Sequence, residues 1–182
     1  MKTEGRLQPE TRKFVEVWLD TGPADWFISR DKPYFGFEIP DHPDKFFYVW
    51  LDAPIGYISS TENWAKKSGQ PEQVDEIWRK KKAKIIHDIG KDIVYFHTLF
   101  WPAMLHAANL AVPSRVRVHG MLTVDGVKMS KSRGTFVNAR TFKQFVDPIF
   151  LRYYFASKIG PSAEDVDLSL EEFVNRVNAE LV

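Results

Sequence analysis

The chain has 182 residues and a net charge of +1, with 25 Lys and Arg against 24 Asp and Glu, so its charge does not favour a dedicated nucleic-acid-binding protein. With 44% hydrophobic, 14% aromatic and 27% charged residues, it is too apolar for intrinsic disorder and long enough to bury a core. It contains no Cys, which excludes disulfides, thiol catalysis and Cys-ligated zinc.

No targeting signal or membrane span is expected. The first five residues have no apolar core of the kind that a signal peptide needs. The longest apolar stretch, residues 93–110, is interrupted by His97, Pro102, His106 and Asn109. The sequence therefore predicts a cytoplasmic protein without a membrane partner.

The first part of the chain contains two helical and two strand-like patterns. Apolar residues at helical spacing predict a helix over residues 11–19, and a second helix is expected over residues 71–79. The apolar run over residues 46–51 is typical of a strand buried on both faces, as in a parallel sheet. Residues 83–89 predict another short strand.

A long helix is expected to begin near Asp92. Its apolar face, within an arc of about 100°, contains Ile93, Phe96, His97, Phe100 and Met104. Pro102 lies inside this pattern and predicts a kink, because proline removes a helical hydrogen bond and clashes with the preceding turn.

A third strand is expected over residues 115–119, followed by a hairpin over residues 122–129. The pair Asp125-Gly126 suits the two positive-φ positions of a type I′ turn in that hairpin.

Beyond Gly134 the pattern becomes helical. Thr141 and Ser169 have capping-box spacing, and Asp147-Pro148 marks a further helix start. The final apolar pattern, from Leu170 onward, predicts a helix whose apolar face packs on something outside this sequence.

Residues 128–132 read Lys-Met-Ser-Lys-Ser and directly follow the predicted hairpin. Together with Arg133 they place three cations and two hydroxyl groups in six residues. Lysines act as adaptable point charges for phosphate, and a loop can close them onto a developing anion. We therefore expect an anion-binding loop rather than a merely solvated one, and we expect residues 128–134 to be poorly ordered without ligand.

This string matches the second signature of the class I aminoacyl-tRNA synthetases, and nearly the whole chain resembles the methionyl-tRNA synthetase family. Residues 48–57, Tyr-Val-Trp-Leu-Asp-Ala-Pro-Ile-Gly-Tyr, are similar to the methionine-pocket strand and loop of that family, and residues 90–104 resemble its next pocket helix. Residues 28–31, 33–36 and 118–120 also match in order. The resemblance implies an α/β fold, namely the C-terminal half of a Rossmann-type parallel sheet followed by a small helical stem-contact segment.

The resemblance implies a methionine pocket, in which an apolar and polarizable lining suits a flexible thioether. Asp92 would receive the α-ammonium group, and Tyr57 and His97 would contact the sulfur or position its neighbours. The methionine-binding residues are then Trp50, Ala53, Pro54, Tyr57, Asp92, Phe96, His97, Phe100 and Trp101. Without the resemblance, these rings would be interpreted as ordinary core, and Asp92 as an acid favoured by a helix N-terminus.

The resemblance also implies an ATP site, with Lys128 and Lys131 as the catalytic residues that stabilise charge on the departing pyrophosphate. The ATP-binding residues are then Lys91, His119, Gly120, Leu122, Lys128, Met129, Ser130 and Lys131. Mg²⁺ is expected to accompany ATP and to be held by phosphates rather than by protein ligands, and no protein-bound zinc is expected. Arg30 is either a structural cation or a cation beside ATP.

The first class I signature, His-Ile-Gly-His, does not occur in the sequence. The chain therefore resembles the second half of a catalytic domain. Residues 1–134 correspond to a partial Rossmann-type domain, residues 135–168 to the helical stem-contact segment, and residues 169–182 to the first helix of the anticodon-binding domain. Half of a parallel sheet exposes apolar surface, which implies a partner that supplies the N-terminal catalytic half, a rearrangement of the helices, or self-association.

The implied activity is that of a methionine–tRNA ligase, which activates L-methionine with ATP to methionyl-adenylate and transfers it to tRNA(Met). Two alternatives remain: a truncated paralogue or split subunit that binds methionine, ATP or a partner without catalysis, and a purely structural fragment. Because the first signature is missing, activity of this chain alone is expected near background.

Overall fold

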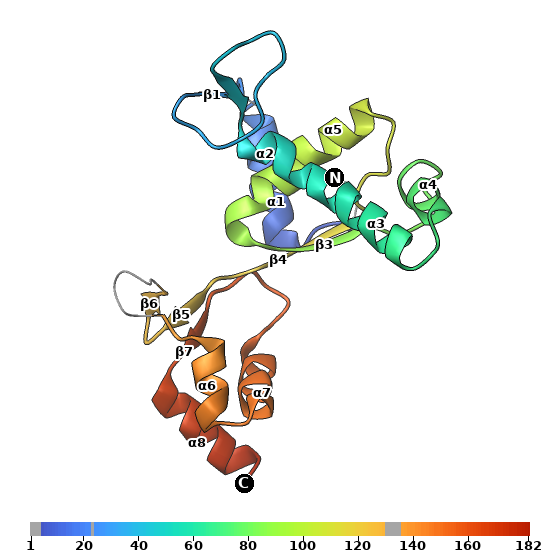
Figure 1. Cartoon of the computed structure of the whole chain (residues 1–182). Coiled ribbons are helices and arrows are strands. Elements are labelled where there is room, and N and C mark those ends of the chain that lie inside the picture. The colour runs from blue at the N-terminus through green and yellow to red at the C-terminus, as the bar shows by residue number, and fades with distance from the viewer. Residues whose placement is uncertain (1–4, 23, 130–135) are drawn as a thin grey trace. The chain divides into compact units, whose positions relative to one another are not determined.

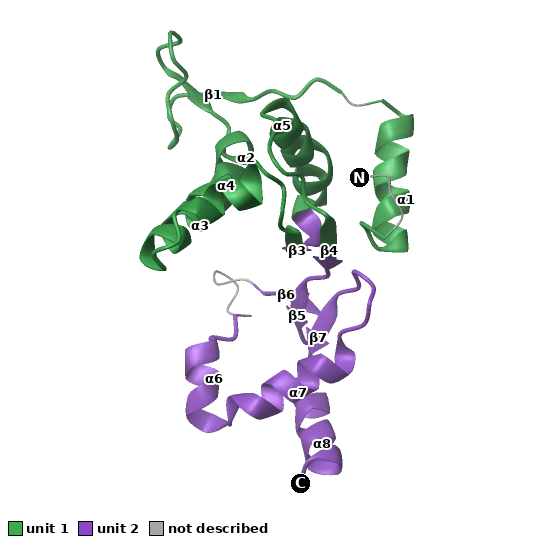
Figure 2. Ribbon diagram, turned by 90° about the vertical axis from the view of Figure 1, so that its right-hand side faces the viewer, with its two compact units in different colours: residues 1–87, 93–117 green, residues 88–92, 118–182 purple. Residues whose placement is uncertain are grey.

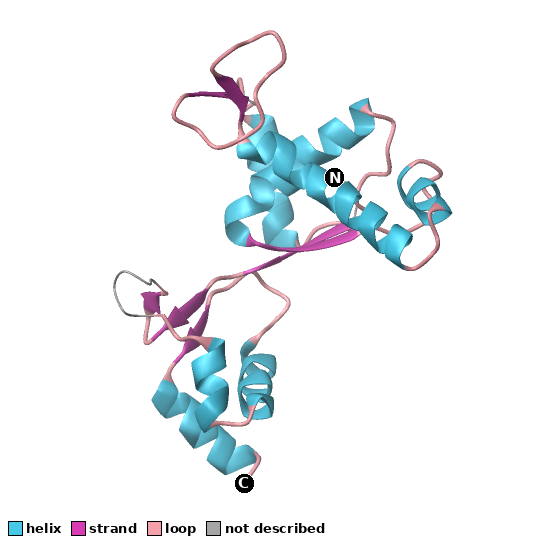
Figure 3. Ribbon diagram, viewed as in Figure 1, coloured by secondary structure: helices cyan, strands magenta, loops and turns pink. Residues whose placement is uncertain are grey.

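The computed structural model describes residues 5–22, 24–129 and 136–182, which are divided between two compact units (Figures 1 and 2). Unit 1 comprises Met1–His87 and Ile93–Arg117, and unit 2 comprises Asp88–Asp92 and Val118–Val182. Helices alternate with small sheets along the chain (Figure 3), which confirms the expected α/β class.

The elements follow one another in the order shown in Figure 1. The helices are α1 Pro9–Asp20, α2 Val49–Asp52, α3 Gly56–Lys67, α4 Glu72–Trp78, α5 Trp101–Ala107, α6 Ala139–Phe145, α7 Pro148–Lys158 and α8 Leu170–Glu180. The strands are β1 Ser29–Asp31, β2 Lys45–Phe47, β3 Ile86–Gly90, β4 Arg115–His119, β5 Leu122–Val124, β6 Val127–Lys128 and β7 Val166–Leu168. Short 3₁₀ turns lie at Ala53–Ile55 and Lys91–Ile93, and a π-helical turn lies at Phe96–Phe100.

The strands form three small sheets in the described part of the chain. β1 and β2 pair antiparallel, and β3 pairs with β4. In unit 2 the strand order is β6-β5-β7, with β5 antiparallel to β6 and parallel to β7. A parallel pair needs a long crossover connection, and α6 and α7 lie in the chain between β6 and β7.

Several sequence predictions are confirmed. The helices expected over residues 11–19 and 71–79 correspond to α1 and α4, and the strand expected over residues 115–119 is β4. The hairpin is also present as β5 and β6, and its turn residues Asp125 and Gly126 have φ values of 48° and 75°. These elements depend on local turn chemistry and periodicity, which a sequence displays directly.

The buried strand expected over residues 46–51 is wrong. β2 ends at Phe47 and pairs antiparallel with β1, and the following residues form α2, the Ala53–Ile55 turn and α3. Pro54 lies at the first turn of its helical segment, a position where its missing N–H is harmless. Phe46 and Phe47 therefore lie in a small antiparallel sheet, whereas Trp50 packs beside a helical turn, on Phe96.

The helix start expected near Asp92 is confirmed although that helix is irregular, whereas the helix expected at Thr141 begins earlier. The helix expected from Asp92 is divided into the Lys91–Ile93 turn, the π-helical turn and α5, and Pro102 lies in the first turn of α5. A proline in that position leaves the preceding backbone irregular. Helix α6 begins before Thr141, because the side chain of Asn138 accepts a hydrogen bond from the Arg140 amide at 2.8 Å and caps the helix there.

Unit 1 has a core of large side chains from α4 and α5. Trp78, Trp101 and Leu105 are buried, and their neighbours come from α3, α4 and the segments around β3 and α5. The unit therefore packs its helices together through tryptophans, which bury more area than aliphatic side chains.

Unit 2 has its own core, and helices α6, α7 and α8 gather beside its small sheet (Figures 1 and 2). Its buried members are Tyr154, Leu168, Phe173 and Val177. Phe173 and Val177 lie on α8, so the apolar face of the last helix is in part covered by this unit itself. The sequence interpretation, in which that face packs on something outside the sequence, is to this extent wrong.

Gly120 is expected to tolerate no side chain. A Cβ atom there would lie 1.9 Å from the carbonyl oxygen of Glu164, whereas one at Gly90 would meet the flexible end of Met121 at 3.3 Å and Cε1 of His119 at 3.7 Å. Gly120→Ala should lower the free energy of unfolding by about 3 kcal/mol, the upper part of the usual range for overpacking. The matched control Gly90→Ala should change it by less than about 1 kcal/mol. Urea denaturation of both variants tests this, and equal stability of the two would contradict the steric argument.

Candidate functional site

Aromatic side chains from four helical segments of unit 1 form a ring cluster. Its members are Trp50 of α2, Tyr57 of α3, Phe96, His97 and Phe100 of the π-helical turn, and Trp101 of α5. Trp50 stacks on Phe96 with ring centroids 4.6 Å apart and planes 9° apart. The structure thus brings together six of the nine side chains that the sequence assigned to methionine.

The hydrogen bonds that His97 makes in the ring cluster have defined donors and acceptors. Nδ1 of His97 lies 2.9 Å from the carbonyl oxygen of Ile93, and Nε2 lies 2.8 Å from the hydroxyl of Tyr57. A carbonyl oxygen only accepts, so Nδ1 carries the proton in this pair. In the neutral imidazole, Nε2 is then the acceptor, and the Tyr57 hydroxyl donates to it.

Burial keeps both of these side chains uncharged. His97 is only 1% exposed, and burial lowers the pKa of its imidazole below the ordinary value, although the hydrogen bond to Ile93 acts in the opposite direction. Burial also raises the pKa of the Tyr57 hydroxyl. At neutral pH the cluster therefore presents rings and a hydroxyl rather than an ion.

Two members of this neighbourhood were missed by the sequence reasoning. Trp26, in the loop between α1 and β1, stacks on Phe100 with centroids 3.9 Å apart. His87 lies 4.6 Å from the ring of Tyr57, and its Nε2 accepts a hydrogen bond from Nε1 of Trp101 at 3.3 Å. The alternating burial of β3 places His87 on the same face as the buried Ile89, a period-two signal that the sequence displays. Trp26 has no such local signal.

The remaining three residues assigned to methionine lie in two short turns. Ala53 is exposed and Pro54 is buried, both in the short turn between α2 and α3 of unit 1. Asp92 is exposed in the Lys91–Ile93 turn and belongs to unit 2. Arg30, the cation with two interpretations, has structural contacts: it donates to the carbonyls of Phe27 and Ser29 and lies 3.7 Å from the ring centre of Tyr48.

Unit 2 places several residues assigned to ATP around one carboxylate. Nζ of Lys91 lies 2.7 Å and 2.8 Å from the two carboxylate oxygens of Asp165, and the Met121 amide donates to the same carboxylate at 2.7 Å. These two hydrogen bonds, that from Lys91 first, hold the pKa of Asp165 below its ordinary value, and the charge of Lys128 acts in the same direction. Nearby, Nδ1 of His119 lies 2.7 Å from the carbonyl oxygen of Gly120.

The hairpin of unit 2 leads into the Lys-Met-Ser-Lys-Ser string. Lys128 is exposed at the end of β6, Met129 is half-buried, and Leu122 is half-buried in β5. Ser130 and Lys131 lie outside the described residues, and so does most of the segment 128–134 whose order was predicted.

In the part of the chain that the structure describes, neither a metal centre nor a membrane span is found. Within residues 5–22, 24–129 and 136–182, no three His, Asp or Glu side chains are grouped so that they could hold a metal ion. Among the same residues, no helix is long and apolar enough to cross a membrane.

The stability of unit 1 is expected to fall when the pH drops below about 6.5, the ordinary pKa of histidine. The folded protein lowers the pKa of His97, so the unfolded chain binds a proton in this range before the folded chain does. Stability is then fully present above pH 6.5 and is lost as the pH falls towards the folded pKa, by at most about 1.4 kcal/mol per pH unit.

Thermal unfolding between pH 5 and 8 checks this expectation. His97→Gln should flatten the pH dependence, whereas the control His106→Gln, at an exposed histidine, should not. His87, whose ring centroid lies 5.4 Å from that of His97, remains in both variants, so the difference between them isolates His97. Identical pH profiles for wild type and His97→Gln would show that His97 does not titrate in this way.

An α/β fold whose hairpin leads into Lys-Met-Ser-Lys-Ser defines a class I aminoacyl-tRNA synthetase segment. The family model described as tRNA synthetases class I (M) matches residues 1–182. The chain belongs to this family, the methionyl-tRNA synthetases.

Two relatives are methionine–tRNA ligases. The chain is 56% identical over 173 residues to the methionine–tRNA ligase of Leptospira interrogans, which covers 94% of this chain and 24% of that protein. It is 55% identical over 180 residues to methionine–tRNA ligase 1 of Sorangium cellulosum, covering 98% of this chain and 26% of that protein. The chain thus spans about a quarter of the length of these relatives.

Solved structures agree with this assignment. A Mycobacterium tuberculosis methionyl-tRNA synthetase bound by methionyl-adenylate superposes with a TM-score of 0.77 and 33% identity, covering 96% of this chain and 33% of that chain. The ligand-free form of the Mycobacterium tuberculosis enzyme gives a TM-score of 0.71 at 30% identity, with 96% of this chain and 32% of that chain covered. The class I synthetase fold expected from the sequence is therefore confirmed.

Proposed function

We propose that this chain forms the methionine-selecting and pyrophosphate-stabilising part of a cytoplasmic methionine–tRNA ligase. The observation that carries the proposal is the pair Tyr57 and His97, which burial keeps uncharged within the ring cluster and which the Ile93 carbonyl orients through Nδ1 of His97. A cluster of uncharged rings suits a thioether, which is polarizable and accepts hydrogen bonds only weakly. The Lys-Met-Ser-Lys-Ser string at residues 128–132 supports the pyrophosphate-stabilising role.

The methionine side chain would lie against the ring cluster, with Ala53 and Pro54 completing the lining. Asp92 would bind the α-ammonium group, because an exposed carboxylate in the turn directly before the π-helical segment can pair with a cation. Selectivity follows from the lack of charge in the cluster: a charged side chain would be desolvated there without an opposite charge.

The ATP side of the reaction would be bound by unit 2. Lys91, His119, Gly120 and Leu122 would contact the nucleotide, together with residues 128–131. The methionine carboxylate attacks the α-phosphorus of ATP, the bond to the bridging oxygen breaks, and pyrophosphate leaves with the electron pair. Lys128 and Lys131 would stabilise the charge on this leaving group, so no protein nucleophile is needed.

Mg²⁺ would accompany ATP through the phosphate oxygens, and tRNA(Met) would accept the methionyl group in the whole enzyme. Residues 1–134, 135–168 and 169–182 would serve as catalytic part, stem-contact segment and start of the anticodon-binding domain. The N-terminal catalytic half would cover exposed rings of unit 1, of which Phe27, Phe35 and Phe37 are more than two-thirds exposed.

Methionine binding to the 182-residue chain tests the proposal by calorimetry. Asp92→Ala should abolish measurable binding, because the loss of one partner of a charge pair typically reduces affinity at least 30-fold, or about 2 kcal/mol. Tyr57→Phe, which removes only the hydroxyl, should weaken binding about threefold to tenfold. The controls are Glu62→Ala, at an exposed carboxylate of α3, and Tyr95→Phe; both should bind methionine normally. Equal affinity of Asp92→Ala and wild type for methionine would show that Asp92 does not bind the α-ammonium group.

A further inference from the structure

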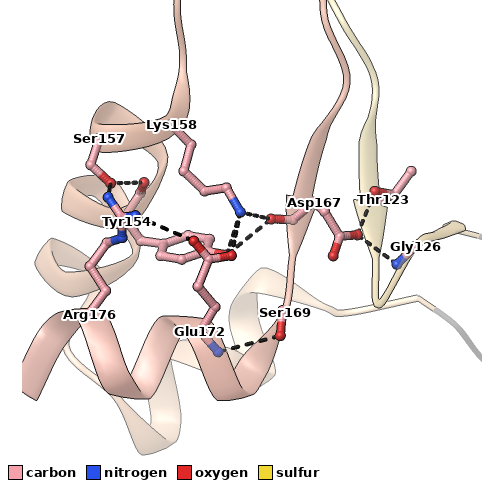
Figure 4. A network of polar contacts seen from close by, with 9 residues as sticks. All are labelled: Thr123, Gly126, Tyr154, Ser157, Lys158, Asp167, Ser169, Glu172 and Arg176. Atoms are coloured by element: carbon pink, nitrogen blue, oxygen red, sulfur yellow. Dashed lines mark hydrogen bonds and ion pairs between the residues drawn. The ribbon is translucent and has the colours of Figure 1, made fainter.

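A carboxylate that the sequence did not assign to any site joins the hairpin of unit 2 to its neighbouring strand. Oδ1 of Asp167, in the middle of β7, accepts a hydrogen bond from the Thr123 hydroxyl at 2.6 Å and from the Gly126 amide at 2.8 Å (Figure 4). Thr123 lies on β5 and Gly126 lies in the turn after it, so a single oxygen atom bridges strand and turn. These two bonds, that from Thr123 first, hold the pKa of Asp167 below its ordinary value.

The main chain of Asp167 is fixed from the other side. Its carbonyl oxygen accepts hydrogen bonds from Nζ of Lys158 at 3.0 Å and from the Tyr154 hydroxyl at 3.1 Å. Both donors also bond to the carboxylate of Glu172, at 2.6 Å and 3.0 Å. As Figure 4 shows, these groups come from α7 and α8, and Tyr154 is fully buried. β7 is therefore bound to the helical core of unit 2 through the main chain of Asp167. The side chain of the same residue binds the hairpin.

The turn that Asp167 holds has two successive residues with positive φ. Asp125 has a φ of 48°, a left-handed conformation that Asp adopts more readily than most residues with a Cβ atom, and Gly126 has a φ of 75°. Strand β6 has only two residues, Val127 and Lys128, and its register with β5 pairs Lys128 with Thr123. So short a strand has few ladder bonds of its own, and the direction of Lys128 depends on the turn before it.

We propose that Asp167 is a positioning residue that holds the Asp125-Gly126 turn, and through it Lys128, in the orientation that meets the phosphates of ATP. It acts through the hairpin and touches no substrate. This inference rests on the proposed function, because Lys128 is assigned there to the leaving pyrophosphate.

The first test needs no enzyme activity. Amide hydrogen exchange is measured by NMR on the 182-residue chain for wild type, Asp167→Ala, Asp167→Asn and Asp147→Ala. Asp167→Ala should accelerate exchange of the Gly126 amide at least about tenfold, because two hydrogen bonds are lost. Asp167→Asn should change it less than about threefold, since its carbonyl oxygen can accept both bonds. Asp147→Ala, which removes a helix cap from α7 in the same unit, should leave Gly126 unchanged.

The second test uses a chimera in which this chain replaces the matching segment of the Leptospira interrogans relative, assayed by methionine-dependent ATP–pyrophosphate exchange. Asp167→Ala should lower kcat about tenfold or more while the KM for methionine stays the same, and Asp167→Asn should restore most of the rate. Unchanged Gly126 exchange in Asp167→Ala would overturn the inference, as would faster Gly126 exchange with an unchanged kcat. If the wild-type chain did not bind methionine, that result would instead count against the proposed function. The amide exchange result would still decide whether Asp167 holds the turn.

Discussion

Methionine-dependent exchange of pyrophosphate into ATP is expected to remain at background when the 182-residue chain is assayed alone. The string His-Ile-Gly-His, which in the resemblance contacts the phosphates from the side opposite Lys128 and Lys131, does not occur in this sequence. Loss of one preorganised donor to a developing anion typically lowers a rate by about 10²–10³, and here a whole set of such groups is missing. The lysines cannot compensate, because much of the rate depends on holding the reacting groups between two opposed contacts.

Adding a separately expressed N-terminal half from the Leptospira interrogans relative should restore part of this exchange. Lys131→Ala should then abolish the gain, whereas Lys143→Ala, at an exposed lysine of α6, should leave it intact. Strong exchange by the chain alone that survived Lys131→Ala would show that both the half-site argument and the role of this lysine are wrong. Methionine binding without any restored exchange would favour the alternative of a non-catalytic binding module.

Replacement of Tyr154 by Ala is expected to unfold unit 2 under conditions in which unit 1 stays folded. The side chain is fully buried among Leu168, Phe173 and Val177, and truncation of a large buried aromatic residue costs about 3–5 kcal/mol. Its hydroxyl also bonds to Glu172 and to the Asp167 carbonyl. The substitution therefore removes both the largest core contact and one of the bonds that fix β7.

A milder variant separates these two contributions. Tyr154→Phe keeps the ring and removes the hydroxyl, so it should cost only about 1–1.5 kcal/mol, since Lys158 still bonds to Glu172 and to the Asp167 carbonyl. The matched control is Tyr153→Phe, whose hydroxyl donates to Glu180 nearer the surface. That change should cost less than about 0.5 kcal/mol. Urea denaturation followed by near-ultraviolet circular dichroism measures the free energy of unfolding of Tyr154→Ala, Tyr154→Phe and Tyr153→Phe. A Tyr154→Ala protein as stable as Tyr153→Phe would mean that this core does not hold unit 2.

The sequence by itself determined the features that depend on neighbouring residues. Asp125-Gly126 predicts its turn because only a few residue types adopt positive φ without strain. Asp147 and Ser169 predict helix starts because their side chains cap the amide groups that follow, as they do in α7 and α8. The Lys-Met-Ser-Lys-Ser string and residues 48–57 likewise indicated the family, because such strings can be recognised without a fold.

Only the tertiary structure decided the features that join distant parts of the chain. Lys91 and Asp165 are 74 residues apart, and Asp167 and Thr123 are 44 apart. β7 has three residues, too few for a periodic signal, and it is a strand because β5 offers a parallel partner. Residues 46–51 show the reverse case, where the second half of a strand-like run becomes helical and Trp50 packs on the π-helical turn. Local chemistry sets turns and caps, whereas pairing and burial over long sequence separations depend on which surfaces the folded chain brings together.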